Sequence, residues 1–388
     1  MAESPDAALN VAMFAPWHEQ CGVRDYTSFL VDALATVPEV ASVRIVSAPA
    51  DAVRHGLGSI VSRYGDDHRR FRQLGSALNG SDVAHIQHQY FLFGGVAPHR
   101  THIDPFLAAI RVPAVMTVHE IATGSGIRGS VVAAANRMNF MPLAIRALIV
   151  HTAADRAQLI RLGCNEANIH LIRHPVPPAL PLPDPDTARL RMEKQYPALQ
   201  GKRVLTLYGF LSAKKGHHAA LRALAQLPAD VALVFAGGRH PDDRTDYVAT
   251  IEAKIAALGL ADRVVTTGYL PAGRVPDVMS VTDIALAPFV QSSGSGSLAN
   301  LLAYSRAVIA SDIEPHRELL AENPRLLALV PTGQSALLAA KIADLLASPE
   351  RRDLLRQAAL EYAATNSYLR MAEATVGVYQ QAIGRLIA

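Results

Sequence analysis

Cysteine is scarce in this sequence: only Cys21 and Cys164 occur among its 388 residues. Two cysteines so far apart cannot build the disulfide framework of a small secreted domain, and they exclude a cysteine-rich zinc site. The sequence also lacks any run of about 18 uncharged apolar residues, and its acidic beginning is unlike a signal peptide. We therefore expect a cytoplasmic protein without a membrane-spanning segment.

Charged residues are few as well, at 18% of the chain. Lysine and arginine number 37 against 34 acidic residues, a net charge of +3 that is too small to form a general nucleic-acid surface. We therefore expect no nucleic-acid partner. Hydrophobic residues make up 50% of the chain, which is enough to fill large cores and excludes extensive disorder.

The length is about twice the ~150 to 200 residues that one hydrophobic core usually serves, so it predicts two domains. Short apolar runs alternate with helical patterns throughout, as in NVAMFAP, DVAHIQH and PAVMTVHE in the first half and KRVLTLYGF, VALVFAGG and DIALAPF in the second. This alternation is typical of βαβ units. We expect an α/β protein with two doubly wound, parallel-sheet, Rossmann-like domains.

Six prolines fall between positions 175 and 185 and interrupt this alternation. Such a stretch should form neither a helix nor a central strand. It predicts a first domain at 1–178, a proline-rich linker at 179–186 and a second domain from 187. Because ligands of doubly wound sheets bind beyond the carboxyl ends of the strands, we looked for chemistry in the strand-end loops.

In the first domain, Gly22 stands before a helix whose free amides can face an anion or a sugar hydroxyl, although an ordinary tight turn explains it equally well. His85 and His88 are three residues apart on a strand and should lie on opposite faces, so we expect no metal site there. His119 and Glu120 end a further strand, where a polar pair favours a functional role over a buried core histidine.

In the second domain, Lys214 and Lys215 precede Gly216 at the expected start of a helix. Two cations beside free helix amides indicate a phosphate site, because the amides donate hydrogen bonds and the ammonium groups supply charge. The alternative is a pair of solvated lysines.

A glycine- and serine-rich loop, QSSGSGSLAN, follows the expected strand DIALAPF and leads into a helix. Its amides and hydroxyls can cradle a diphosphate. Gly294, Gly296 and Ala299 also satisfy the dinucleotide fingerprint, with Asp312 as a ribose-binding acid, so an NAD(P)-dependent oxidoreductase is a rival interpretation. Against it, residues 289 to 293 separate the strand from the first glycine.

These motifs, in their order and spacing, resemble the retaining GT-B glycosyltransferases of family 4, which include bacterial mannosyltransferases of polysaccharide assembly. The resemblance covers nearly the whole chain, through CGVRDYT, HIQHQYFLFGG, TVHE, IRHPVP, YGFLSAKKG, VFAGG, TTGYLP and AVIASDIEPHREL. It implies two domains facing a cleft, with acceptor binding in the first, nucleotide-sugar binding at 187–366, and a helix at 367–388 that crosses back to the first domain.

The resemblance also implies roles for individual residues. His119 matches the histidine that contacts the transferred sugar, and Lys215 the lysine that neutralises the leaving diphosphate. Donor-binding positions are Gly22, Lys214, Gly268, Tyr269, Ser292, Ser293, Gly294, Ser295, Gly296, Ser297 and Asn300, and acceptor-binding positions are His88, Gln89 and Tyr90.

Two departures from the family pattern concern the donor site. Phe210 stands where the family usually has an arginine, so one phosphate-binding cation is missing or replaced by Lys214. Ser292 and Asn300 align with a pair of glutamates that ordinarily bind the donor sugar and the ribose. Both are neutral but can hydrogen-bond hydroxyls, so the loss affects the identity of the sugar.

The expected activity is transfer of a hexosyl unit, mannosyl among the candidates, from a GDP- or UDP-linked sugar to a hydroxyl acceptor in polysaccharide or glycoconjugate biosynthesis. No metal or other cofactor is expected, and the configuration of the sugar should be retained. A non-catalytic sugar-nucleotide-binding protein on the same fold is a further alternative. The acceptor is a saccharide, a lipid-linked sugar or a small molecule.

The segment 128–161 carries five arginines and one aspartate among apolar residues. It is either an internal helix of the first domain or a surface that binds anionic lipid on the inner face of the membrane. The arginines are Arg128, Arg137, Arg146, Arg156 and Arg161.

Overall fold

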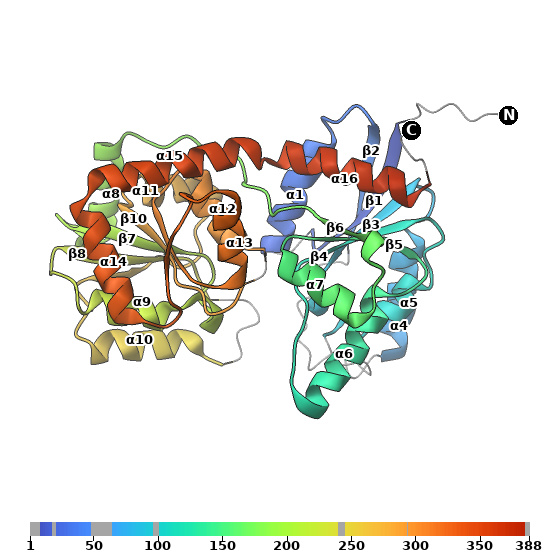
Figure 1. Cartoon of the computed structure of the whole chain (residues 1–388), viewed down its shortest axis with the longest axis horizontal. Helices are drawn as coiled ribbons and strands as arrows, with labels where there is room; N and C mark the ends of the chain where they lie inside the picture. The colour runs from blue at the N-terminus through green and yellow to red at the C-terminus, as the bar shows by residue number, and fades with distance from the viewer. Residues whose placement is uncertain are drawn as a thin grey trace. The chain divides into compact units, whose positions relative to one another are not determined.

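The computed structural model describes residues 8–17, 21–47, 64–95, 101–239, 245–292 and 294–384. The chain divides into two units, residues 1–174 with 368–388 and residues 175–367. Each unit contains a six-stranded sheet whose strand pairs are all parallel among the described residues, with helices on both faces (Figure 1). The predicted fold class, two doubly wound α/β sheets, is confirmed.

The sheet of the first unit has the strand order β2-β1-β3-β4-β5-β6. Its strands are β1 (Leu9–Phe14), β2 (Val40–Val46), β3 (Val83–His88), β4 (Ala114–Val118), β5 (Ile145–Val150) and β6 (Ile169–Leu171). Its helices are α1 (Gly22–Leu34), α4 (Tyr64–Ser76), α5 (Ile103–Leu107), α6 (Gly126–Phe140), α7 (Ala153–Leu162) and α16 (Tyr368–Ala382).

The sheet of the second unit has the order β12-β11-β10-β7-β8-β9. Its strands are β7 (Arg203–Tyr208), β8 (Val231–Ala236), β9 (Val264–Thr266), β10 (Ile284–Ala287), β11 (Val308–Ser311) and β12 (Ala328–Val330). Its helices are α8 (Pro185–Gln195), α9 (His217–Leu224), α10 (Tyr247–Ala257), α11 (Val275–Ser280), α12 (Gly296–Ala303), α13 (Glu314–Glu322), α14 (Ser335–Ala347) and α15 (Pro349–Thr365).

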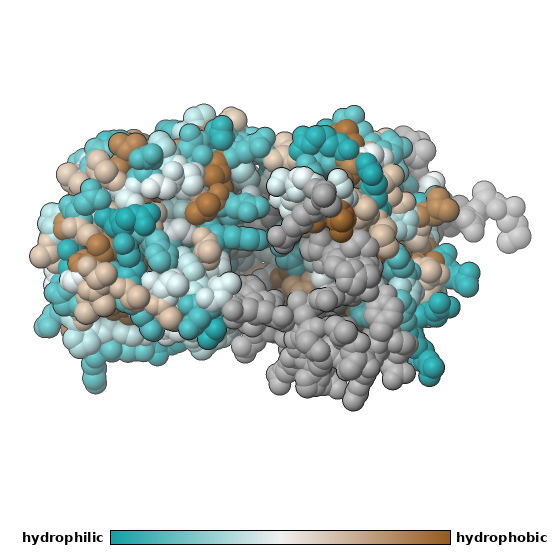
Figure 2. All heavy atoms as spheres, turned by 90° about the horizontal axis from the view of Figure 1, so that it is seen from below, coloured by the Kyte–Doolittle hydropathy of each residue, from teal (hydrophilic) through white to brown (hydrophobic). Residues whose placement is uncertain are grey.

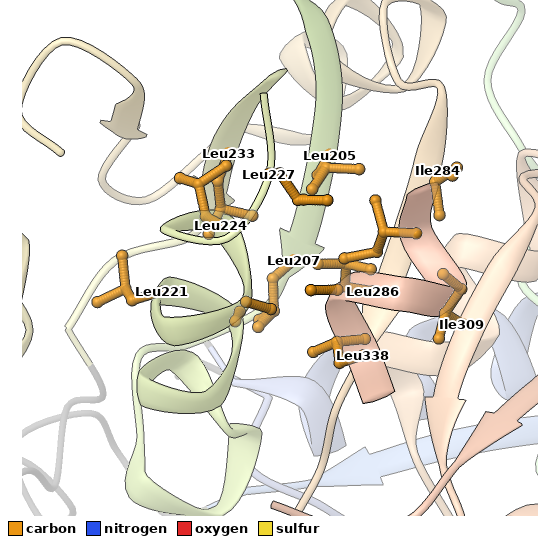
Figure 3. Packing of buried hydrophobic residues seen from close by; sticks show 14 of the residues in the cluster. Leu205, Leu207, Leu221, Leu224, Leu227, Leu233, Ile284, Leu286, Ile309 and Leu338 are labelled. Atoms are coloured by element: carbon orange, nitrogen blue, oxygen red, sulfur yellow. The ribbon is translucent and has the colours of Figure 1, made fainter. Parts of the chain in front are cut away.

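Continuous apolar strands explain why both sheets are covered on both sides. In the second unit, Leu205 and Leu207 face a core with Leu233 and Leu286 (Figure 3), while the intervening residues of the same strands face the opposite core. Strands buried on both faces are the pattern expected of parallel sheets. On the face seen in Figure 2, hydrophobic side chains form only small patches among hydrophilic ones.

The last helix, α16, belongs to the first unit. Its buried residues recur at helical spacing, from Tyr368 and Met371 through Ala372 and Thr375 to Tyr379, so one stripe faces the sheet. The helix packs beside α1 and joins the same core as the strand residues Val11 and Met13.

The proline-rich segment differs slightly from the prediction, because helix α8 begins at Pro185, inside the predicted linker of 179–186. Proline is tolerated at the first helical position, where its missing N–H would have no partner in any case. Asp184 caps the helix, since its Oδ1 accepts a hydrogen bond of 2.9 Å from the Thr187 amide.

A close backbone approach joins the loops that follow β7 and β10. Gly216 has φ 77°, and a Cβ atom there would overlap the carbonyl oxygen of Pro288. The amide of Val290 donates a 2.8 Å hydrogen bond to the carbonyl of Lys214 in the same contact. Only glycine satisfies both the left-handed backbone and the missing side-chain space.

We therefore predict that Gly216→Ala lowers the free energy of unfolding of the second unit by about 2 to 5 kcal/mol. The left-handed backbone costs about 1 to 2 kcal/mol for a residue with a Cβ, and displacing the Pro288 carbonyl adds about 1 to 3 kcal/mol. Denaturant unfolding followed by circular dichroism measures the loss.

Gly259→Ala is the matched control, because Gly259 has φ 64° but no atom within 4 Å of an added Cβ. It should lose only the backbone contribution, about 1 to 2 kcal/mol. Equal losses for the two variants would mean that the contact with Pro288 does not matter.

Candidate functional site

The strand order of the second unit reverses between β7 and β10, which are neighbours in the sheet. Loops that leave such a pair diverge to opposite faces and open a crevice at the carboxyl ends of the strands. The loop after β7 carries the two lysines, and the loop after β10 carries the serine-rich segment. The sequence prediction therefore falls on the two loops that this topology favours for ligand binding.

Lys215 is the cation that these loops hold in place. Its Nζ donates a 2.9 Å hydrogen bond to Ser297 Oγ and lies 4.0 Å from the centre of the Phe289 ring. The side chain is half-buried, and burial, followed by repulsion from Lys214, lowers its pKa to about 8. Lys215 is thus a positioned, partly dehydrated ammonium group at the beginning of α12.

Lys214 is arranged differently, although it is the adjacent residue. Its side chain is exposed, while its carbonyl accepts the hydrogen bond from Val290. The loop therefore presents one fixed and one solvent-facing cation.

The serine-rich loop forms the N-terminus of α12. Ser295 is the N-cap, and its Oγ accepts a 3.3 Å hydrogen bond from the amide of Leu298. Asn300 turns back onto its own helix, where Nδ2 donates to the carbonyl of Gly296 at 2.9 Å. Ser292 and Gly294 are half-buried beside this helix start, whereas Ser293 lies outside the described residues.

The strand-end segment after β9 lies close to the loop after β8. Gly268 has φ 70°, and the Tyr269 side chain is 52% exposed. A Cβ on Gly238 would crowd the Tyr269 amide, and the Leu211 amide donates a 2.8 Å hydrogen bond to the Gly238 carbonyl. Gly238, which follows β8, thus brings Gly268 and Tyr269 next to the loop after β7.

In the first unit, His119 is half-buried at the end of β4 and belongs to a chain of hydrogen bonds. Its Nε2 lies 2.8 Å from Gln87 Oε1, and Gln87 Nε2 lies 3.3 Å from His85 Nε2. His85 Nδ1 lies 2.6 Å from the hydroxyl of Tyr379 on α16, and its Nε2 lies 2.8 Å from Thr117 Oγ1.

This chain specifies which nitrogen atoms carry protons. An amide oxygen only accepts, so His119 donates to Gln87 through Nε2–H, and the amide nitrogen of Gln87 then donates to His85 Nε2. The hydroxyls of Tyr379 and Thr117 complete the hydrogen bonds of the His85 ring. His119 therefore has Nδ1 as its acceptor nitrogen in the neutral ring.

The surroundings of His119 keep the ring neutral near pH 7. The pKa of His119 lies well below its ordinary value, chiefly because of burial and then because His151, His174, His88 and His85 surround it. The ring of Tyr26 on α1 contacts it edge-on, with ring centres 4.7 Å apart.

No role was assigned to Gln87 from the sequence, and His85 was considered only as a partner of His88 in a metal site. The two-residue spacing of His85 and Gln87 places both side chains on one face of β3. His85 faces Tyr379, whereas His88 faces Asn139 of α6 on the other side of the sheet.

The three predicted acceptor-binding residues have partners within the first unit. His88 is fully buried, with Nε2 3.1 Å from Asn139 Oδ1. Tyr90 is buried, and its hydroxyl donates a 2.6 Å hydrogen bond to Asn136 Oδ1. Gln89 is half-buried and donates to Glu120 at 3.4 Å, so it is the most accessible of the three.

Gly22 is the first residue of α1, after the N-cap residue Cys21, which makes no side-chain capping hydrogen bond. No atom of the described chain lies within 4 Å of a Cβ built on Gly22. With respect to the described residues, the first turn of α1 is therefore open on this side.

A family comparison connects the second unit to known proteins. The model of the family described as "Glycosyl transferases group 1" matches residues 189–362. These residues are therefore similar to the glycosyl transferases group 1 family. The match contains the β7 and β10 loops, Lys215 and the serine-rich segment, and it does not favour the rival oxidoreductase interpretation.

Curated relatives of this chain include the 2-deoxystreptamine glucosyltransferase of Streptomyces kanamyceticus, 31% identical over 43% of this chain and 44% of the relative. Another is the GDP-mannose-dependent alpha-(1-6)-phosphatidylinositol monomannoside mannosyltransferase of Mycolicibacterium smegmatis, 32% identical over 29% of this chain and 28% of the relative. The chain thus spans less than half the length of these two relatives.

Among solved structures, HepE of Anabaena in complex with UDP and glucose is similar over 96% of this chain and 100% of the other chain. The TM-score is 0.72 at 16% sequence identity, which establishes the shared GT-B fold. The predicted GT-B fold is therefore confirmed for both units.

We predict that Gln87→Glu raises the pKa of His119, because a carboxylate in place of the amide favours the charged ring. Gln87→Leu, which removes the acceptor without adding charge, should leave the pKa low. Nitrogen-15 histidine NMR across a pH titration measures both, with His119→Asn used to assign the resonance.

In the wild-type protein the same spectra should show His119 protonated at Nε2. A His119 ring protonated at Nδ1, or identical titrations of the Glu and Leu variants, would contradict the hydrogen-bond chain.

Proposed function

We propose that this protein is a glycosyltransferase that moves a hexosyl unit from a nucleotide diphosphate sugar to a hydroxyl acceptor. The observation that carries the proposal is Lys215, an ammonium group fixed by Ser297 and Phe289 at the switch point of a unit similar to the glycosyl transferases group 1 family. Its position beside the start of α12 suits the diphosphate that leaves when the sugar is transferred.

Lys215 and the α12 amides stabilise the leaving group in this proposal. Charge develops on the diphosphate as the bond from the anomeric carbon to oxygen breaks, and a fixed cation near that oxygen lowers the barrier. Lys214 contributes a second, solvent-exposed cation in place of the arginine that Phe210 replaces.

His119 and Gly22 act on the donor from the first unit. The neutral ring of His119, oriented by Gln87, accepts a hydrogen bond from a sugar hydroxyl through Nδ1. The amides of the first turn of α1 at Gly22 face the anionic donor. Neither role requires His119 to carry charge or to act as a nucleophile.

The sugar is transferred with retention in this proposal. The acceptor hydroxyl attacks the anomeric carbon on the face from which the diphosphate departs, and its proton passes to the departing phosphate oxygen. We assign charge compensation to Lys215 and the helix amides, so the reaction should proceed without added metal. Among the described residues, no group of three or more His, Cys, Asp or Glu side chains suits a metal ion.

A hexose is the expected sugar, because the relatives include a glucosyltransferase and a mannosyltransferase. Ser292 and Asn300 replace two glutamates with neutral groups, so the donor hydroxyls meet weaker acceptors. We propose UDP- or GDP-linked donors and a role in polysaccharide or glycoconjugate biosynthesis.

The experiment is an assay for nucleoside diphosphate release with UDP-, GDP- and ADP-linked hexoses and a panel of hydroxyl acceptors, in the presence of EDTA. We expect acceptor-dependent release, and we expect Lys215→Ala to lower turnover by about 10²- to 10³-fold through loss of transition-state stabilisation.

Lys214→Ala is the adjacent control and should lose less turnover, since its side chain is exposed. A larger loss at position 214 would reverse the two assignments. Donor binding without turnover would identify a non-catalytic sugar-nucleotide-binding protein, and binding of NAD(P)H without release of nucleoside diphosphate would favour an oxidoreductase.

The surface around the end of α6 supports a membrane-bound acceptor. Leu143 is 93% exposed, Met141 and Val131 are about half exposed, and Arg146 is exposed on β5. Arg137 reaches across to the Leu162 carbonyl at 3.1 Å. We propose that this apolar and basic surface contacts anionic lipid, so that the acceptor is a lipid-linked sugar on the inner leaflet.

Two arginines of segment 128–161 bind other side chains of the first unit, and the side chain of a third is outside the described residues. Arg156 pairs with Glu166 at 2.8 Å, and Arg161 donates to Gln158. The side chain of Arg128 is not among those described. Within the described ranges, no helix combines the length and hydrophobicity needed to span a bilayer.

We predict that the wild-type protein co-sediments with anionic vesicles and that Leu143→Ser with Arg146→Gln weakens this binding. Loss of Arg146 alone removes about 1 kcal/mol of attraction at low salt, and high salt should screen the remainder. Leu190→Ser on α8, which also removes an exposed leucine, is the control and should bind as the wild type does. Absence of wild-type binding at low salt would leave a soluble acceptor.

A further inference from the structure

A cavity of about 470 Å³ lies within the second unit, away from the loops described above. Its lining includes Asp283, which lies directly before β10, and Arg306, which lies just before β11. The candidate donor loops follow the carboxyl ends of the strands, so this cavity lies at the opposite, amino-terminal edge of the sheet. It is therefore a separate feature from the site around Lys215.

The cavity is rich in arginine. Four arginines and two aspartates line it, which leaves two positive charges in excess. The charged lining residues are Arg189, Arg306, Arg352, Arg356, Asp283 and Asp353. They come from α8, α15 and the segments before β10 and β11.

Arg306 is the most enclosed of these side chains, at 8% exposed. Its Nε donates a 2.8 Å hydrogen bond to the Tyr304 carbonyl, and Nη1 lies 3.5 Å from the Thr282 carbonyl. Among the described residues, no carboxylate oxygen lies within 4 Å of this guanidinium group. Burial, and then the charge of Arg356, lowers its pKa to about 10, and Asp283 opposes this.

The other arginines are also neutralised incompletely. Arg352 donates to the carbonyls of Leu345 and Leu346 at the end of α14, and these contacts satisfy its N–H groups without compensating its charge. Arg189 donates to the Lys202 carbonyl and has Glu193 at 3.9 Å, so its charge is partly compensated. Arg356 has Asp353 at 3.4 Å, an exposed pair of the weak kind.

A buried cation with no carboxylate within ion-pair distance is unfavourable, and an anion that enters the cavity relieves this. A guanidinium group has five N–H donors in a planar arrangement that matches the oxygens of a phosphate. The carbonyl contacts of Arg306 use only some of these five donors. The volume exceeds that of a single phosphate ion and lies in the range of small-molecule sites.

From these observations we propose that the cavity is an anion site for a phosphate monoester of a small metabolite, bound by Arg306 and Arg356. Leu182 and Pro183 of the proline-rich segment also line the cavity, so an occupant would contact this segment and α15 together. Binding should therefore stabilise the second unit against unfolding.

Isothermal titration calorimetry of the full chain, with inorganic phosphate and with a hexose 6-phosphate as ligands, tests the proposal. We expect saturable binding, with the ester tighter than the free ion, and affinity reduced by about tenfold or more in Arg356→Gln. Arg306→Lys, which keeps the charge but loses the fork, should also bind more weakly, with folding checked by circular dichroism.

Two controls separate this cavity from other phosphate sites. Arg351→Gln removes a neighbouring arginine of α15 that pairs with Asp344 and does not line the cavity, so its affinity should equal that of the wild type. Lys215→Ala should also retain binding, because Lys215 lies at the opposite edge of the sheet. Equal affinity for phosphate and ester would assign the site to inorganic phosphate.

The proposal would be overturned by a lack of saturable binding at about 10 mM ligand, the range of weak metabolite sites. It would also be overturned if Lys215→Ala abolished binding, or if Arg356→Gln and Arg351→Gln had the same effect.

Discussion

The backbone contact between the loops that follow β7 and β10 is the constraint on which the candidate donor site depends. Gly216 packs against the Pro288 carbonyl, and this contact places Phe289 and α12 beside Lys215. Without the contact, the ammonium group would lose both its aromatic neighbour and Ser297. The two loops leave neighbouring strands, so the fold brings them together and the glycine lets them touch.

Much of the fold could be predicted from the sequence, because parallel strands buried on both faces give continuous apolar runs. DIALAPF and VALVFAGG are examples, and they are β10 and β8. Short elements and elements that begin with proline were harder to predict. Strand β12 is three residues long, and α8 begins at Pro185 because proline fits the first turn of a helix.

The candidate site could be predicted only where its residues are contiguous in the sequence of one loop. Lys214, Lys215 and the serine-rich segment are contiguous motifs, whereas the neighbours of His119 come from β3 and α16. The His85 to Tyr379 contact joins residues 294 positions apart, and no local pattern reports such a contact. The two-residue spacing of His85 and Gln87 was a usable signal, because it places both side chains on the same face.

Lys215 and Arg306 are cations that one unit holds, half-buried and buried respectively, at opposite edges of its sheet. Neither has a carboxylate within ion-pair distance among the described residues, and burial lowers the pKa of both groups. A folded protein tolerates such groups only if other packing offsets their cost. Lys215 has the Phe289 ring and Ser297, and Arg306 has backbone carbonyls. In both places protein groups accept some of the hydrogen bonds that the cation can donate, but no carboxylate of the described residues lies within ion-pair distance to compensate its charge. An anionic ligand would supply that compensating charge.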